Sequence, residues 1–349
     1  MTNAAFGIER ASASEARYWE PRADKAVVCT LCPHLCHIGD GLYGVCGVRR
    51  NDDGKLKTLI YGLSAAVNVD PIEKKPLFHF LPGTQSLSIA TVGCSFRCPF
   101  CQNYDLSQVT KGKNRELFGR PMEPGEIVAL AKQAKASSVA FTYSEPTIFY
   151  EYAYDCAKLA AEEGIRGVFV SNGFITEDPI TAIRPYIHAY NVDIKSFNPD
   201  FYRKVLGARL EPVLEAIKVI HREQFWLEIA TVVIPGQNDS DHELAQIAEF
   251  IGELSVDIPW HVSAFHPDYK MTNVPRTTVE SIERAISIGR DAGLRYVYSG
   301  NTLIGDTSST RCPGCQTRVI HRVGFQVLQN QLKDGKCPDC GTAIAGVWS

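Results

Sequence analysis

The sequence lacks the features that mark several classes of protein. It contains no run of 18 apolar residues, so we expect no transmembrane helix. Residues 1–20 carry early acidic side chains and no apolar segment, so we expect no secretory signal and a cytoplasmic protein. Lysine and arginine together number 36 against 39 aspartates and glutamates, and this balance gives no support for nucleic-acid binding. Low-complexity tracts and short repeats are also absent from the sequence.

Cysteine, in contrast, is abundant, with twelve in 349 residues. In a long chain without an expected secretion signal, clustered cysteines indicate metal binding in a reducing cytosol rather than disulfides. Eleven of them form an N-terminal set, a three-cysteine loop and a C-terminal set. These groups are Cys29, Cys32, Cys36 and Cys46; Cys94, Cys98 and Cys101; and Cys312, Cys315, Cys337 and Cys340. The twelfth, Cys156, lies in a helical pattern, and we expect it to be a small core residue.

The cysteine groups and the hydrophobic pattern divide the chain into three regions. Residues 1–83 form an N-terminal Cys-rich segment that ends in a proline-rich stretch, residues 84–305 alternate apolar strands with amphipathic helices, and residues 306–349 hold the C-terminal set. The expected strands are 87–92, 138–143, 167–171, 190–194, 226–234, 261–265 and 296–299. The expected helices are 124–136, 147–163, 210–223, 239–254 and 277–292. This alternation predicts an α/β fold of βαβ units with parallel pairing, either a barrel or an open doubly wound sheet.

The most informative motif directly follows the first expected strand. Cys94, Cys98 and Cys101 have the spacing C-x3-C-x2-C on one tight loop. Three thiolates there can hold three corners of a cubane iron–sulfur cluster, whereas closed clusters take four cysteines. The fourth iron would then be open to a substrate or cosubstrate. The alternative interpretation is a three-cysteine remnant of a zinc knuckle.

The spacing of this loop, with Phe100 directly before the third cysteine, resembles the radical S-adenosylmethionine (radical SAM) superfamily. The resemblance implies a [4Fe–4S] cluster whose open iron binds the amino and carboxylate groups of S-adenosylmethionine. Reductive cleavage would give methionine and a 5′-deoxyadenosyl radical that abstracts hydrogen from a substrate. The resemblance also implies a partial (β/α)6 TIM-like barrel over residues 84–305, with 296–299 as an extra strand. Functional groups of α/β barrels lie at the C-terminal ends of the strands.

Two expected strand ends carry candidate contacts to S-adenosylmethionine. Tyr143-Ser144-Glu145-Pro146 resembles the Gly-Gly-Glu-Pro motif of the superfamily, although tyrosine and serine replace the two glycines. The resemblance implies that the backbone near Ser144 and the carboxylate of Glu145 receive the methionine ammonium. At the end of the next strand, Asn172 is similarly expected to face the cosubstrate, with a simple turn as the alternative.

The fourth expected strand ends in Asp193 and Lys195, which the alternation of a strand places on one face. They could neutralise each other at the mouth of the barrel. A similar Asp-x-Lys in the pyruvate formate-lyase activating enzyme group contacts S-adenosylmethionine. This likeness implies that Lys195 pairs with its carboxylate and Asp193 with its ribose or amino side, while Phe100 packs against the adenine. Further along, His266 is either a substrate contact or a structural histidine.

The two flanking cysteine sets predict further metal sites. In the C-terminal set, two C-x2-C pairs are separated by 21 residues, which is typical of a zinc-ribbon-like module, with rubredoxin-type iron as the alternative. The N-terminal set could bind zinc or an auxiliary iron–sulfur cluster, and its spacing does not decide between them. His34 and His37 could replace one of its ligands.

The order of these motifs over nearly the full chain resembles the radical SAM component of the AmmeMemoRadiSam system, a relative of pyruvate formate-lyase activating enzymes. The resemblance implies an activating-enzyme-like oxidoreductase acting on a protein or small molecule, with glycyl-radical-enzyme activation as the most specific version. It also implies a reducing partner such as flavodoxin or ferredoxin, and association with Memo-like and AMMECR1-domain proteins. The alternative is a non-catalytic scaffold that binds protein or nucleic acid through its two four-cysteine modules, which predicts zinc alone.

Overall fold

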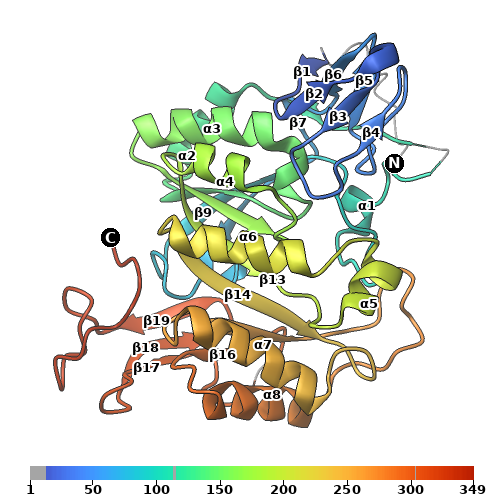
Figure 1. Cartoon of the computed structure of the whole chain (residues 1–349). Helices are drawn as coiled ribbons and strands as arrows, with labels where there is room; N and C mark the ends of the chain where they lie inside the picture. Colours follow the sequence, from blue (N-terminus) through green and yellow to red (C-terminus); the bar gives the residue numbers. More distant parts are fainter. Residues whose placement is uncertain (1–12, 113–114, 303) are drawn as a thin grey trace, which may run out of the picture.

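The centre of the molecule is an eight-stranded sheet (Figure 1). The structure is a computed structural model and describes residues 13–112, 115–302 and 304–349. The strand order is β16-β15-β14-β13-β12-β11-β9-β8, with parallel pairing from β9 to β16 and an antiparallel edge strand, β8. A doubly wound sheet reverses its strand order part-way, whereas this order is sequential. The α/β class with a mostly parallel sheet is therefore confirmed, and within the described residues the two end strands do not pair, as in a partial barrel.

The elements of this core follow the expected ranges closely. Its strands are β8 (Ala66–Pro71), β9 (Gln85–Ala90), β11 (Ser138–Phe141), β12 (Arg166–Ser171), β13 (Ile187–Asp193), β14 (Trp226–Val233), β15 (Trp260–Ala264) and β16 (Val297–Gly300). Its helices are α1 (Tyr104–Ser107), α2 (Pro124–Gln133), α3 (Tyr150–Glu162), α4 (Glu177–Ile183), α5 (Pro199–Phe201), α6 (Glu211–Arg222), α7 (Asp241–Leu254) and α8 (Val279–Asp291). The sequence pattern had not indicated α4, which is only seven residues long.

Local sequence explains where two of the long helices begin. Pro124 is the first residue of α2, and the side chains of Glu123 and Glu126 form a reciprocal capping box with the backbone. The Ser240 hydroxyl accepts a hydrogen bond from the Glu243 N–H, 3.3 Å away, and caps α7. Both helix starts agree with the expectation from the sequence.

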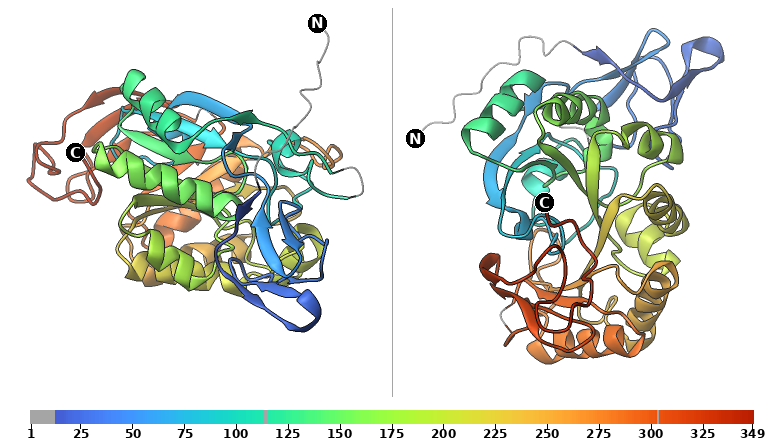
Figure 2. Two further views of the ribbon diagram at one scale, coloured as in Figure 1. Left: turned by 90° about the horizontal axis from the view of Figure 1, so that it is seen from above. Right: turned by 90° about the vertical axis from the view of Figure 1, so that its left-hand side faces the viewer.

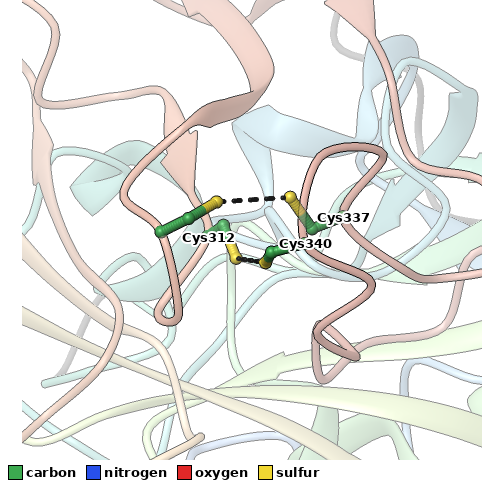
Figure 3. A group of neighbouring side chains, drawn as sticks. Cys312, Cys337 and Cys340 are labelled. Carbon is green, nitrogen blue, oxygen red and sulfur yellow. Dashed lines mark hydrogen bonds between the residues drawn. The ribbon is translucent and has the colours of Figure 1, made fainter.

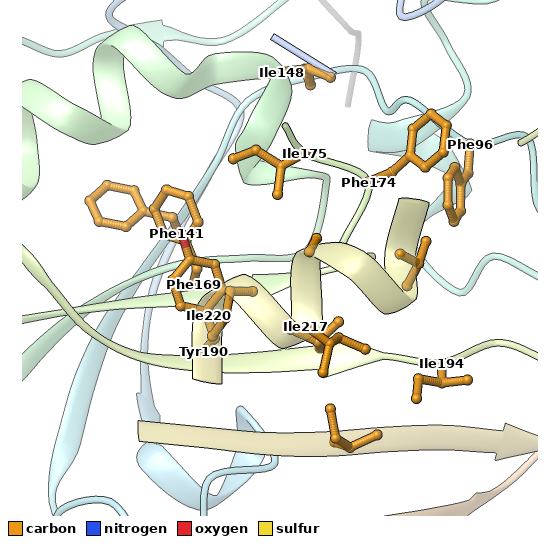
Figure 4. Packing of buried hydrophobic residues seen from close by; sticks show 14 of the residues in the cluster. Phe96, Phe141, Ile148, Phe169, Phe174, Ile175, Tyr190, Ile194, Ile217 and Ile220 are labelled. Carbon is orange, nitrogen blue, oxygen red and sulfur yellow. The ribbon is translucent and has the colours of Figure 1, made fainter. Parts of the chain in front are cut away.

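The helices cover the outer face of the sheet through a row of aromatic side chains. Phe141, Phe169 and Tyr190 are in register on three adjacent strands and are fully buried (Figure 4). Their ring centroids are 5.5 Å and 5.3 Å apart, and Ile217 and Ile220 of α6 belong to the same core. In the right-hand view of Figure 2, the green to orange helices follow an arc along this face. Alternation along each strand therefore leaves the opposite side chains for the concave face.

A short proline-rich stretch fills one end of the concave face. We call residues 72–82 the plug segment; it includes the 3-10 helix η2 (Ile72–Lys74). Its apolar side chains form a core cluster with inward-facing Ala140, Val168 and Ala189 of three strands. The Asn191 amide donates to the Pro76 carbonyl at 2.8 Å, so the sheet also holds the plug segment by polar contacts.

Two smaller regions flank the sheet. The N-terminal region contains β1 (Ser14–Glu15), β2 (Trp19–Pro21), η1 (Ala23–Lys25), β3 (Val27–Cys29), β4 (His37–Ile38), β5 (Arg49–Asp52), β6 (Lys55–Thr58) and β7 (Leu63–Ser64), which pairs with β10 (Arg120–Pro121). The C-terminal region is a three-stranded sheet of β17 (Thr310–Arg311), β18 (Arg318–Val323) and β19 (Gln326–Asn330). Strand β8 of the main sheet lies within the segment that the sequence pattern grouped with the N-terminal cysteines. Among the described residues, none of the helices is long and apolar enough to cross a membrane.

Candidate active site

A cavity of about 1000 Å³ opens on the concave face of the sheet. It is lined by strand ends, by the plug segment and by the tip of the β18–β19 hairpin. The three-cysteine loop and all six candidate contacts predicted for S-adenosylmethionine line this one cavity. These residues are Cys94, Cys98, Cys101, Phe100, Ser144, Glu145, Asn172, Asp193 and Lys195. Residues from four different strand ends thus converge, as expected for a barrel.

The three-cysteine loop is held by hydrogen bonds from the polypeptide around it. The Cys94 sulfur accepts from the Phe96 N–H at 3.3 Å, and the Asn172 amide lies 3.8 Å from the same sulfur. Asn172 also donates to the Ser95 hydroxyl at 3.0 Å, and Cys101 lies 3.1 Å from the Ser107 hydroxyl. Such contacts fix the loop and tune a thiolate-bound metal centre.

The chemistry of these thiols fits a metal cluster. Burial raises the pKa of Cys94 to about 12 and raises that of Cys98 further, so neither would ionise readily without a cation. Metal binding replaces the thiol protons. Three thiolates that bind different irons of one cluster leave one iron without a protein ligand.

The segment that replaces the Gly-Gly-Glu-Pro motif keeps the backbone shape that glycine favours. Tyr143 has a left-handed conformation with φ of 63°. Its carbonyl accepts a hydrogen bond from Asn103 at 3.1 Å, and its side chain turns away toward Asp70. The next residue, Ser144, has a buried hydroxyl with no partner among the described residues. This orphaned polar atom in the cavity wall fits a polar ligand.

Glu145 links the ends of β11 and β12. One carboxylate oxygen accepts from the Thr147 N–H at 3.0 Å, the Thr147 hydroxyl at 2.7 Å and the Ser171 hydroxyl at 2.8 Å. Within the described residues, the other oxygen accepts only from the Asn172 N–H, at 2.8 Å, and therefore keeps acceptor capacity. Burial raises the pKa of Glu145, and these hydrogen bonds oppose the shift.

Asp193 and Lys195 lie side by side, as the strand alternation predicted. The Lys195 ammonium is 2.7 Å from the Asp193 carboxylate, and both side chains are largely buried. Burial alone would lower the pKa of Lys195, but the adjacent Asp193 carboxylate outweighs it, so the net pKa is raised. The lysine therefore presents a fixed positive charge to the cavity. The pair can neutralise itself or receive a zwitterionic ligand.

A second buried charge cluster borders the cavity and was not expected from the sequence. Asp70 accepts from Lys74 at 2.8 Å, from Lys75 at 2.7 Å and from the Tyr143 hydroxyl. Burial lowers the pKa of Lys75 to about 8, although its ion pair with Asp70 opposes the shift. Both lysines line the cavity. They belong to the plug segment, whose proline-rich sequence has no periodicity that would place it inside a barrel.

The segment that contains His266 contacts the outer side of the three-cysteine loop. His266 lies 3.0 Å from the Gln102 amide, and the Lys270 N–H donates to the Pro99 carbonyl at 2.9 Å. Tyr269 stacks on Tyr104 with ring centroids 4.6 Å apart. His266 is not among the described residues that line the cavity. In this structure the segment contacts the three-cysteine loop, and within the described residues His266 reaches the cavity only through Gln102.

The C-terminal set has a different geometry. All four of its sulfurs lie within 4.8 Å of one another, a spacing that suits one metal ion (Figure 3). In the parts of the chain that the structure describes, no other group of three or more cysteine, histidine or acidic donors is so close. The module contacts the rest of the protein through the buried Arg322, whose guanidinium donates to the Phe78 carbonyl of the plug segment.

The N-terminal set lies next to the three-cysteine loop. The carbonyl of Cys46 accepts from the Thr110 hydroxyl at 2.7 Å, and Lys111 donates to the carbonyls of both Val45 and Cys94. His34, which the sequence suggested as an alternative ligand, instead lies 2.9 Å from the Ser95 carbonyl of the three-cysteine loop. Two cysteine groups more than 40 residues apart in the sequence are thus neighbours.

Comparison with known proteins agrees with this geometry. The family model described as Radical SAM superfamily matches residues 88–251. An uncharacterized protein of Methanocaldococcus jannaschii is 40% identical over 333 residues, which cover 95% of this chain and 98% of the relative. This chain belongs to the radical SAM superfamily.

This radical SAM protein is also homologous to activating enzymes. The pyruvate formate-lyase-activating enzyme of Staphylococcus epidermidis is 23% identical over 223 residues, covering 58% of this chain and 88% of that enzyme. Among solved structures, a radical SAM methyltransferase from Sphaerobacter thermophilus matches with a TM-score of 0.50 at 19% identity, covering 64% and 68% of the two chains. The structural match supports the fold, and it leaves the substrate open.

Proposed function

We propose that this chain is an activating-enzyme-like radical SAM oxidoreductase, with a [4Fe–4S] cluster on Cys94, Cys98 and Cys101. When bound, the cluster supplies the electron that cleaves S-adenosylmethionine into methionine and a 5′-deoxyadenosyl radical, which takes hydrogen from the substrate. The observation that carries the proposal is that the three cysteines and all six candidate cosubstrate contacts line one cavity. The cavity lies at the upper end of the size range of small-molecule sites, which leaves room for cosubstrate and part of a substrate.

The side chains around the cavity supply complementary groups for each part of S-adenosylmethionine. The Ser144 hydroxyl, unpartnered among the described residues, and the less occupied oxygen of Glu145 can accept from its ammonium. Lys195 can pair with its carboxylate, and Asp193 can accept from its ribose hydroxyls or amino group. Phe100 is an apolar wall suited to the adenine. Asn172, which holds the three-cysteine loop and Glu145 together, acts as a positioning residue.

The proposal extends to the partners that the sequence resemblance implies. The substrate is a protein or a small molecule, and a glycyl radical enzyme is the most specific candidate. Reduced flavodoxin or ferredoxin would supply the electron in the cell. As a component of an AmmeMemoRadiSam system, the chain would associate with Memo-like and AMMECR1-domain proteins. The C-terminal set, with four sulfurs around one point, would hold zinc.

The test is anaerobic reconstitution with iron and sulfide, followed by dithionite and S-adenosylmethionine. The proposal predicts formation of 5′-deoxyadenosine by the wild-type chain and none by Cys94→Ala. Incubation with fractions of a deuterated extract should then identify the substrate by transfer of deuterium to 5′-deoxyadenosine. A protein with a filled cluster that makes no 5′-deoxyadenosine would contradict the proposal.

A further inference from the structure

The N-terminal set remains unused by the function proposed above. Its four thiols come from the end of β3 and the loops around β4, and they gather on one side of the N-terminal region. Cys29 and Cys46 are buried, while Cys32 and Cys36 are partly exposed. Spacing in the sequence leaves zinc and an iron–sulfur cluster equally open. The arrangement of the sulfurs in space bears on this choice.

A single zinc ion places a strict limit on the spacing of its ligands. With zinc–sulfur bonds of about 2.3 Å, two sulfurs on one ion lie at most about 4.6 Å apart. The C-terminal set comes close to this limit, since its four sulfurs lie within 4.8 Å of one another and two pairs of them are 3.5 Å and 3.6 Å apart. In the described parts of the chain, no three sulfurs of the N-terminal set come within 4.8 Å of one another. In this structure the N-terminal set is therefore less compact than the C-terminal set.

The three-cysteine loop provides an internal comparison. Its sulfurs also exceed the single-ion spacing in the described residues, and its motif is that of a cluster-binding loop. Thiolates on a [4Fe–4S] cluster bind four different irons, and those on a [2Fe–2S] cluster bind two irons in pairs, so a set of four spreads more widely than it does on one ion. The N-terminal set resembles the loop in having no such compact group of three sulfurs within the described residues, although Cys32 lies near its other three cysteines.

A buried cation shows that the N-terminal set is built for negative charge. Arg49 is 1% exposed, and its guanidinium donates to the Cys29 sulfur at 3.4 Å. The same guanidinium pairs with Glu151 and donates to the Arg17 carbonyl at 3.0 Å, so its position is fixed from both sides. A charge-assisted hydrogen bond to sulfur stabilises a thiolate more than a neutral thiol. Hydrogen bonds to sulfur also adjust the reduction potential of iron–sulfur clusters.

The N-terminal set lies directly against the three-cysteine loop. Gly93, directly before Cys94, has φ of 101°, and a Cβ there would lie 3.3 Å from the Cys46 carbonyl and 2.9 Å from Val48. This close approach requires glycine and brings the backbones of the two cysteine groups together.

We infer that Cys29, Cys32, Cys36 and Cys46 bind a second iron–sulfur cluster, a closed [2Fe–2S] or [4Fe–4S] centre beside the three-cysteine loop. Such a cluster would be a one-electron carrier next to the three-cysteine loop.

The decisive experiment removes the first cluster and examines the second. The variant Cys94→Ala/Cys98→Ala/Cys101→Ala is reconstituted anaerobically with iron and sulfide, desalted, and analysed for iron, acid-labile sulfide and zinc. We expect iron and sulfide in equal amounts, between about a third and about a half of the wild-type content for a two-iron or four-iron cluster. Dithionite should then produce an electron paramagnetic resonance signal. Zinc in excess of the C-terminal set, with no sulfide, would overturn the inference.

Two further variants distinguish a failure of this inference from a failure of the proposed function. Cys29→Ala/Cys32→Ala should lose the share of iron that the triple variant retains, and should keep the cluster of the three-cysteine loop. If the proposed function fails, this variant would hold no iron while the triple variant still does. Cys156→Ala, which removes a buried thiol outside all three groups, should match the wild type and control for cysteine loss. Mössbauer spectroscopy of the unmutated protein counts the clusters even where a variant does not fold, and a single cluster would contradict the inference.

Discussion

The three-cysteine loop and the C-terminal set both present cysteine thiols, but the loop leaves its thiols open to a cavity and the C-terminal set encloses a single point. Four sulfurs of the C-terminal set enclose one point at the edge of the molecule, so a metal there is fully coordinated by protein. The three sulfurs of the loop line a cavity, next to the buried Ser144 hydroxyl and an ion pair. A closed site contributes stability, and an open site leaves a coordination position for chemistry. The number and spacing of thiols thus separate structural from reactive metal sites within one chain.

The largest effect should come from breaking the open site. Cys98→Ala removes a buried ligand at the wall of the cavity, and we expect loss of that cluster and of all 5′-deoxyadenosine formation above background. Chromatographic quantification of 5′-deoxyadenosine after anaerobic incubation with dithionite provides the measurement. Cys156→Ala is the matched control, and it should retain wild-type product formation. Product from a cluster-free Cys98→Ala protein would show that the loop is not the reactive site.

Breaking the closed site should instead affect stability. Cys312→Ala removes a fully buried ligand from the core that joins the C-terminal module to Tyr296 and Tyr298. We expect loss of the bound zinc, lower solubility and a fall of roughly 5 °C or more in apparent Tm, because each kcal/mol shifts Tm by about 2–4 °C in chains of this kind. Formation of 5′-deoxyadenosine per bound iron–sulfur cluster should stay within about twofold of the wild type. If Cys312→Ala made no 5′-deoxyadenosine although its three-cysteine loop held a full cluster, the C-terminal set would not be a purely structural site.

Lys195→Met tests whether the ion pair serves the cosubstrate. Loss of a charge-assisted bond costs about 1.5–3 kcal/mol, so the Kd for S-adenosylmethionine should rise roughly 10- to 100-fold. Equilibrium dialysis with the reconstituted protein measures this change. Lys204→Met is the control, since Lys204 makes a comparable 2.7 Å ion pair with Asp200 on the exposed surface. An unchanged Kd in Lys195→Met would mean that Asp193 and Lys195 only neutralise each other.

The last prediction concerns the plug segment, and its effect appears only as the pH is raised. The pKa of Lys75 is lowered to about 8, from 10.5 in the unfolded chain. Between these pH values the unfolded chain binds the extra proton, so raising the pH favours the folded state by about 1.4 kcal/mol per unit. The apparent Tm of the wild type should therefore gain on that of Lys75→Met from pH 8 to about pH 10. A difference that stays constant with pH would show that Lys75 keeps its proton.

The sequence predicted the framework well because the framework is local. The alternation of apolar strands and helices placed seven parallel strands within a few residues, and the expected starts at 124 and 239 lie within two residues of the starts of α2 and α7. The candidate contacts came from the resemblance to radical SAM motifs, which lie at the ends of the expected strands, where functional groups of barrels are found. Asp193 and Lys195 accordingly lie 2.7 Å apart.

Contacts between distant segments could not be predicted in the same way. Lys75 borders the cavity because residues 72–82 fold back into the sheet, and nothing periodic in that stretch indicates this path. The contact of Arg49 with Cys29, and the approach of Cys46 to Gly93, also depend on how separate loops close in space. The spacing of cysteines in the sequence left zinc and iron–sulfur open for the N-terminal set, and which of the two it binds depends on how its loops close in space.

The most direct test of the central claim is Mössbauer spectroscopy of Cys29→Ala/Cys32→Ala, which isolates the cluster of the three-cysteine loop. Spectra are recorded anaerobically with and without S-adenosylmethionine. An open corner predicts that a single iron subsite changes its isomer shift when S-adenosylmethionine is added, while the other irons stay the same. A spectrum that does not change, from a protein with a full complement of iron, would contradict the account.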